Sequence, residues 1–144
     1  MIKDGNQVII IGGGYGTCSI VLGVAKDLGI NPANVFSGIS SFDKNDNFVV
    51  TPDKIGFFNC VTGEKITNNF IKSEVISYLK KKEIIKGKVI HVGDGENDLE
   101  VWNSGQADLF IGFGVNKTNK KVKDYAPVFV KTVFNFNEYI DQNI

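Results

Sequence analysis

The feature that most constrains the fold is an apolar run that ends in glycines and leads into a helix, and the chain carries it twice. Val8–Ile11 is a run of four β-branched residues followed by three glycines, and Lys88–Val92 is followed by Gly93-Asp94-Gly95. Such runs predict strands that are buried on both faces. Strands that alternate with helices predict an α/β fold, here a Rossmann-like parallel sheet with flanking helices.

The remaining elements follow from periodicity and from turn residues. Apolar residues recur at helical spacing from Thr17 to Leu28, and Gly29 stands where a left-handed cap ends a helix. The turn-forming cluster Asp43–Asp46 predicts a small β-hairpin insertion over residues 39–58. Further strands are predicted at 34–36, 107–113 and 127–130, and further helices at 70–82, after the second glycine turn to about 104, at 116–125 and at 134–141. All elements are assigned to a single domain, 1–144.

Two carboxylates belong to the second glycine turn. Asp94 lies between glycines that let the backbone turn sharply, and Asp98 follows four residues later on the incoming helix. Both can face one point at the carboxyl edge of the sheet, where open α/β folds bind ligands. Carboxylate oxygens suit a hard cation such as Mg²⁺. On the residues alone, the alternative is an Asp that caps the helix while Asp98 stabilises its first turn.

The first glycine turn, Gly12-Gly13-Gly14, has the form of a phosphate cradle. A strand, glycines and a helix in this order expose backbone N–H groups beside the positive end of the helix. The run lacks the full dinucleotide-binding pattern, because no acidic residue ends a second strand about 20 residues further on. Taken alone, such a run is more often a plain tight turn than a phosphate site.

The six residues from Gly93 to Asp98 resemble the fourth motif of the haloacid-dehalogenase superfamily, and the chain is most similar to phosphoserine phosphatases of the eukaryotic kind. The resemblance implies that Asp94 binds Mg²⁺ as the cofactor, that Asp98 supports the metal shell and that Asn97 contacts the phosphate or the substrate. The stretches that share it outside the motif are Leu28–Ile30, Asn34–Phe36, Ala107–Gly114 and Val122–Asp124.

The same resemblance implies roles for Lys72 and for the glycine turn. Lys72 alone would be an ordinary solvated lysine, but its place between the two glycine turns matches the catalytic lysine that pairs with phosphate in this family. Gly12, Gly13 and Gly14 correspond to the phosphate-binding turn. Gly12 stands where these phosphatases have serine, which removes one hydroxyl donor.

The nucleophile motif of the family, Asp-x-Asp-x-Thr/Val, is not found in the sequence. No two of the ten aspartates are two residues apart. In the family this motif ends the central strand and is followed by a helical cap, so both are expected to be missing, and Met1–Asn6 resembles the end of a helix. We expect a fragment or one part of a split phosphatase that acts with a complementing N-terminal segment. The alternative is a catalytically inactive module that binds Mg²⁺, phosphate or a protein partner.

Composition restricts the partners. Sixteen lysines balance sixteen acidic residues, so no net charge favours nucleic acid or a membrane surface, and the longest apolar run is far shorter than the roughly 20 residues of a membrane span. The expected ligand is a small phosphomonoester, with O-phosphoserine favoured for a role in serine biosynthesis. Cys18 and Cys60 lie far apart without a pairing pattern, so two free thiols and a cytoplasmic location are predicted.

Overall fold

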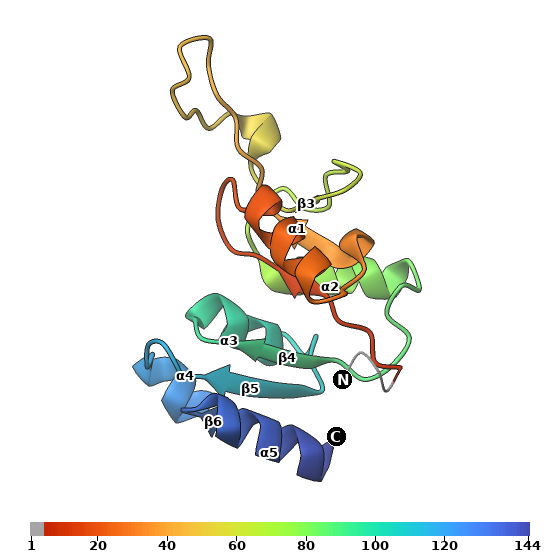
Figure 1. Cartoon of the computed structure of the whole chain (residues 1–144), viewed down its shortest axis with the longest axis vertical. Helices are drawn as coiled ribbons and strands as arrows, with labels where there is room; N and C mark the ends of the chain where they lie inside the picture. The colour runs from red at the N-terminus through yellow and green to blue at the C-terminus, as the bar shows by residue number, and fades with distance from the viewer. Residues whose placement is uncertain (1–4) are drawn as a thin grey trace. The chain divides into compact units, whose positions relative to one another are not determined.

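The computed structural model describes residues 5–144, and the chain divides into two compact units, Met1–Ile71 and Lys72–Ile144 (Figure 1). Each unit holds a three-stranded sheet, and three of the four strand pairings are parallel. The predicted α/β class with parallel strands is therefore confirmed. The predicted helix end at 1–6 falls mostly outside the described residues.

In the first unit, the central strand is β2 (Val35–Ser37). It pairs in parallel with β1 (Ile10–Ile11) and in antiparallel with β3 (Phe58–Asn59), and helix α1 (Cys18–Asp27) packs against it. Two short 3-10 helices, Pro32–Asn34 and Pro52–Lys54, lie in the connections. The core of the unit consists of Ala25, Ile30 and Val35, with Val8, Ile10, Val21, Leu22 and Cys60 packed against them.

Helix α1 ends as predicted, because Gly29 adopts the left-handed conformation with φ of 68°. Its apolar positions do not all face the core. Ala25 is fully buried, whereas three residues that form one stripe are 70%, 48% and 61% exposed: Ile20, Val24 and Leu28. The helical spacing of the apolar residues therefore predicted the helix correctly but did not predict which of these residues are buried.

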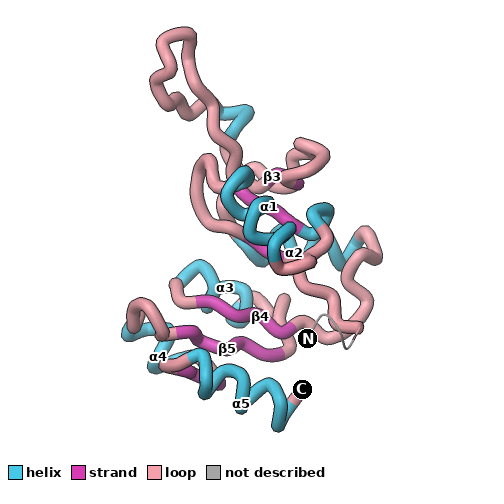
Figure 2. Tube along the Cα trace, in the orientation of Figure 1, coloured by secondary structure: helices cyan, strands magenta, loops and turns pink. Residues whose placement is uncertain are grey.

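The predicted hairpin at 39–58 is reduced to a tight turn in a segment that is mostly loop (Figure 2). Phe42 and Phe48 form one antiparallel bridge. Between them, the Asp43 carboxylate accepts hydrogen bonds from the N–H groups of Asn45 and Asn47. These side-chain bonds satisfy the turn locally, so a longer ladder is not needed to hold it.

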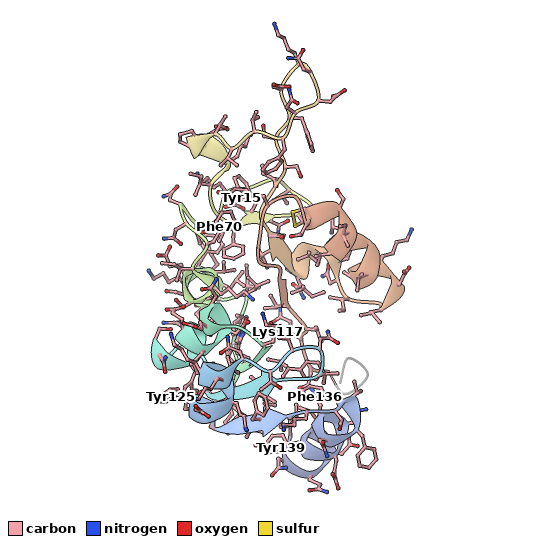
Figure 3. All side chains as sticks on the ribbon, turned by 90° about the vertical axis from the view of Figure 1, so that its left-hand side faces the viewer. Tyr15, Phe70, Lys117, Tyr125, Phe136 and Tyr139 are labelled. Atoms are coloured by element: carbon pink, nitrogen blue, oxygen red, sulfur yellow. A yellow bond between two sulfur atoms is a disulfide. The ribbon has the colours of Figure 1, made fainter. Side chains whose placement is uncertain are left out.

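Cys18 and Cys60 form a disulfide with their Cα atoms 5.4 Å apart, seen as a yellow bond in Figure 3. The prediction of two free thiols is therefore wrong. Cys18 is the first residue of α1 and Cys60 directly follows β3, so the fold brings together positions 42 residues apart in sequence. The bond ties the start of α1 to the loop that follows β3.

In the second unit, three parallel strands lie in the order β4, β5, β6. Helix α3 packs against β4 and β5, and α5 contacts β6. The core includes Leu99, Phe110 and Val122. The bounds are β4 (Ile90–Gly93), β5 (Leu109–Phe113), β6 (Val128–Val130), α2 (Lys72–Lys81), α3 (Glu96–Asn103), α4 (Lys120–Tyr125) and α5 (Val133–Asn143).

Strands β1 and β4 are each at the edge of their sheet in the described part of the chain. Their predicted complete burial is wrong: Ile10 and Ile11 are half-buried, and Ile90 and Val92 are 36% and 39% exposed. An apolar run indicates a strand but does not say whether both faces are covered. Over residues 5–144 we find no helix that is both long enough and apolar enough to span a membrane.

Candidate functional site

The turn after β4 places Asp94 at the carboxyl end of the strand. Gly93 ends β4, and a side chain there would collide with the carboxyl group of Asp98, so glycine is required. Asp98 lies in the first turn of α3, and its Oδ2 accepts a hydrogen bond from the Gly95 N–H at 3.1 Å. This bond holds the turn as one half of a capping box does. Asp98 thus fixes the backbone around Asp94, whose own side chain is exposed.

Asp98 is only 5% exposed, and its Oδ1 binds two side chains. Lys72 Nζ donates to it at 2.6 Å, and His91 Nε2 lies at 2.9 Å. Burial alone would raise the pKa of Asp98, but the His91 hydrogen bond and the Lys72 charge outweigh burial and lower the pKa to about 2. The carboxyl group is therefore ionised at neutral pH, and its bond to Lys72 is charge-assisted.

His91 reaches Asp98 from strand β4. Its ring stacks on Phe110 with centroids 5.9 Å apart and an interplanar angle of 23°. Because an ionised carboxylate only accepts hydrogen bonds, Nε2 must donate to Asp98. The strand and the aromatic ring beneath it therefore set the orientation of the carboxylate.

Lys72 is positioned by the contact between the start of α2 and α3. Its neighbour Ser73 is buried, and the Ser73 hydroxyl donates to Glu100 Oε1 at 2.7 Å. The second oxygen, Glu100 Oε2, is buried and has no hydrogen-bond partner among the described residues. The Ser73–Glu100 bond joins the two helices beside the Lys72–Asp98 ion pair, one residue further along α2 and two residues further along α3.

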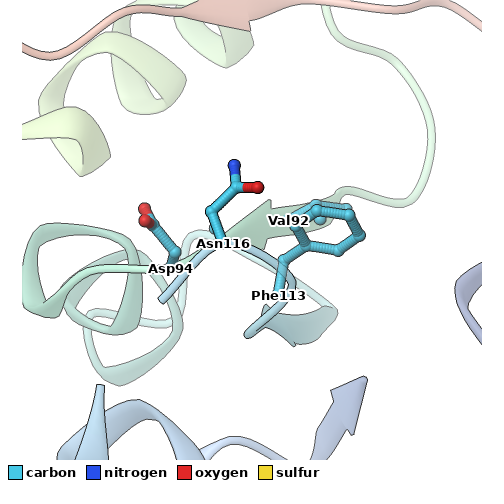
Figure 4. A pocket seen from close by; sticks show the side chains of 5 residues that line it. Val92, Asp94, Phe113 and Asn116 are labelled. Carbon is cyan, nitrogen blue, oxygen red and sulfur yellow. The ribbon is translucent and has the colours of Figure 1, made fainter. Parts of the chain in front are cut away.

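A cleft of about 270 Å³ opens at the carboxyl ends of β4 and β5 (Figure 4). Parallel strands bring the residues that follow them to the same edge of the sheet, and here these residues include Asp94 and Asn116. Both side chains project to the same side in Figure 4. The cleft is lined by Val92, Gly93, Asp94, Phe113 and Asn116.

The polar residues of the cleft fit a Mg²⁺ ion that has few protein ligands. Mg²⁺ keeps several waters and is bound through one or two carboxylates together with substrate phosphate. Asp94 is the exposed carboxylate, and the Asn116 amide offers a second oxygen in the same cleft. Both oxygens of Asp98 are already engaged, which suits a supporting role. Within residues 5–144 there is no cluster of three or more His, Cys, Asp or Glu that could hold a metal by themselves.

The first glycine turn belongs to the first unit. The Gly12 N–H donates to Phe36 O at 2.8 Å, which continues the pairing of β1 with β2. Gly13 and Gly14 are exposed, and Gly14 has φ of 113°, which favours glycine. Beside the turn, the Tyr15 ring packs edge-on against Phe70 at a centroid distance of 4.8 Å (Figure 3).

The structure brings two of the predicted site residues, Lys72 and Asp98, into direct contact. Asp94 lies on the turn that Asp98 braces, and Asn97 is exposed in the first turn of α3. Two residues at this site were not predicted. Asn116 could have been found from the rule that parallel strand ends meet, because it follows β5 closely. His91 had no such signal, since a single histidine in an apolar strand gives no indication of its partner.

Several curated proteins are similar in sequence. The phosphoserine phosphatases of Rattus norvegicus and Homo sapiens are 36% identical over 124 residues, which is 86% of this chain and 49% of each relative. The phosphoserine phosphatase of Drosophila melanogaster is 29% identical over 130 residues, covering 88% of this chain and 42% of the relative. The chain thus spans about half the length of the relatives it matches. No family model matches.

Two solved structures share the fold of this chain. A phosphoserine phosphohydrolase-like protein from Francisella tularensis subsp. tularensis SCHU S4 has a TM-score of 0.74 at 20% identity, covering 96% of this chain and 57% of its own. DsGPDH of Dunaliella salina has a TM-score of 0.66 at 27% identity, covering 96% of this chain and 20% of its own.

Proposed function

Because the chain belongs to the haloacid-dehalogenase superfamily as a phosphoserine phosphatase-like member, we propose that it carries the Mg²⁺ and phosphate sites of a phosphomonoester hydrolase. The observation that carries the proposal is the ion pair between Lys72 and the ionised Asp98, directly behind the turn that presents Asp94. A buried ion pair contributes little net stability, so we attribute this one to the position that it gives the Lys72 side chain. Here it holds a cation at the edge where a phosphate would bind.

Each residue has a distinct proposed role. Asp94 would hold Mg²⁺, which neutralises charge on the phosphate, and Asp98 would support it by bracing the turn. Lys72 would neutralise a second phosphate oxygen, while Asn97 would donate to the substrate. The N–H groups of Gly13 and Gly14, two exposed residues, would bind the phosphate, as backbone donors do at strand-to-helix turns. This assignment requires the two units to act as one domain, 1–144.

The reaction would need a nucleophilic carboxylate from a complementing N-terminal segment. That carboxylate would attack phosphorus, the alcohol would leave with a proton, and water would then release inorganic phosphate. We propose O-phosphoserine as the substrate and serine biosynthesis in the cytoplasm as the setting.

The test is reconstitution of activity. The chain would be combined with a segment that carries Asp-x-Asp-x-Thr/Val, and Mg²⁺-dependent release of phosphate from O-phosphoserine would be measured. We expect activity that is lost in Asp94→Asn and kept in Asp124→Asn, a matched change at an exposed carboxylate of α4. A folded complex without activity, or equal activity in both variants, would refute the assignment.

The second candidate is a module that binds Mg²⁺ and phosphate without turnover. It is favoured by the spacing of the ten aspartates, none of which is two residues from another. Calorimetry of the chain alone with Mg²⁺ and then O-phosphoserine separates the candidates, because the module must bind both without any added segment. Failure to bind either ligand would exclude this candidate.

A further inference from the structure

A pair of hydroxyl groups fills the space where Gly12 lacks a side chain. A Cβ atom on Gly12 would lie 2.9 Å from Ser37 Oγ and 3.3 Å from Thr17 Oγ1. Contacts of that length are tighter than ordinary packing, so a side chain at position 12 would displace the Ser37 hydroxyl. Gly12 has no side-chain donor of its own, but the hydroxyls of Ser37 and Thr17 occupy the space where its side chain would lie.

From this arrangement we propose that the Thr17 hydroxyl is the side-chain phosphate donor of the glycine turn and that buried Ser37 holds it in position. The inference rests on the proposed function, because it names a further ligand of the same phosphate site. It accounts for a phosphate turn whose first residue is glycine, because the donor is Thr17, directly before α1, and its support is Ser37, at the end of β2.

Ser37 is suited to support because it cannot reach a ligand itself. It is fully buried at the end of β2, and its Oγ contacts Thr17 Oγ1 directly. A buried hydroxyl must satisfy its proton within the protein. The other acceptor within reach, Gly12 O, lies at 3.3 Å, a long distance for an O–H···O bond. We assign the shared proton to Ser37, which donates to Thr17.

With that assignment, Thr17 keeps its own proton for another acceptor. Its alternative, Gly14 O, lies at 3.5 Å, beyond the usual range for such bonds. An anionic phosphate oxygen is a stronger acceptor than a carbonyl and would take this proton. Thr17 is half-buried beside exposed Gly13 and Gly14, and its side chain does not cap α1. Its hydroxyl therefore remains available at the turn.

The test compares hydroxyl removal with hydroxyl retention. Inorganic phosphate would be titrated into the full chain with Mg²⁺ present, and binding followed by amide chemical shifts. Thr17→Val keeps the shape but not the hydroxyl, and we expect it to weaken phosphate binding by about tenfold, the loss of one charged hydrogen bond. Thr17→Ser should bind phosphate like the unmodified chain. Neither change should alter Mg²⁺ affinity. Thr17→Val should also lower Tm, because it removes the acceptor of the buried Ser37 proton, so phosphate binding is measured well below the Tm of both variants.

A double-mutant cycle tests the part played by Ser37. Gly12→Ser alone should lower Tm, because its Cβ displaces the Ser37 hydroxyl, whereas Gly12→Ser in the Ser37→Ala background should be tolerated. Phosphate binding by that double variant should survive Thr17→Val, since the donor then sits at position 12. If the unmodified chain binds phosphate and Thr17→Val binds it equally well, the inference is wrong while the proposed function stands. If the unmodified chain binds neither phosphate nor Mg²⁺, both are overturned.

Discussion

The second unit holds its candidate residues in place with buried charged side chains, whereas the first unit relies on backbone groups, hydroxyls and a disulfide. Asp98 is held by Lys72 and His91 at the edge of a three-stranded parallel sheet. In the first unit the strands are only two or three residues long, and Cys18–Cys60 ties its helix to the loop after β3. Short strands contribute few hydrogen bonds and little buried area, so the covalent link carries more of the stability.

The largest effect should follow reduction of the disulfide. The link closes a loop of 42 residues, for which loss of the bond is expected to lower the free energy of unfolding by about 4 kcal/mol. Melting with and without dithiothreitol would show it. The only tryptophan, Trp102, packs against the core of the second unit and serves as its fluorescent probe. Reduction should therefore shift amide signals of the first unit and leave Trp102 fluorescence unchanged. A Cys60→Ala variant that melts like the oxidised chain would contradict this.

Next in size is the neutralisation of Asp98. Asp98→Asn keeps the shape but leaves the Lys72 cation, whose side chain is 14% exposed, without its counter-charge, and we expect a loss of about 3 kcal/mol. Denaturation followed by Trp102 fluorescence would measure it. The matched control is Glu96→Gln, which breaks the exposed Lys121–Glu96 pair and should have no measurable effect. Equal effects of the two variants would mean that burial does not distinguish these pairs.

Acid should weaken the second unit through the same residue. The pKa of Asp98 is lowered from 3.8 to about 2 in the folded chain, so the unfolded chain binds the proton more readily. Stability from this group is therefore complete above about pH 4 and is lost as the pH falls towards 2, by about 2 kcal/mol in total. Trp102-detected unfolding between pH 5 and 2 should show this slope, and Asp98→Asn should flatten it. If stability fell equally steeply with pH in Asp98→Asn, a group other than Asp98 would cause the acid sensitivity.

What the sequence could predict also differs between local and distant features. The glycine turns, the cap at Gly29 and the strand ending in Gly93-Asp94 were predictable because each depends on neighbouring residues. The Cys18–Cys60 bond was not, because it depends on how α1 and β3 meet in the fold. Burial of Ile90 and Val92 was overpredicted, since an apolar strand has the same composition at an edge as in the interior. The contact of His91 with Asp98 likewise arises only from tertiary packing.

The smallest expected effect concerns the side chain of Asn116, which shares the cleft with Asp94. If Asn116 supplies a second oxygen to the proposed Mg²⁺ site, Asn116→Ala should lower Mg²⁺ affinity by about three- to tenfold, the value of one modest polar contact. Calorimetry of the full chain would measure it, with Asn137→Ala on the exposed face of α5 as the control. Because the first unit is proposed to bind phosphate and not Mg²⁺, single side-chain truncations there should leave Mg²⁺ affinity unchanged. The proposed roles of the two units would be contradicted if Asn116→Ala left Mg²⁺ affinity unchanged while Thr17→Val lowered it.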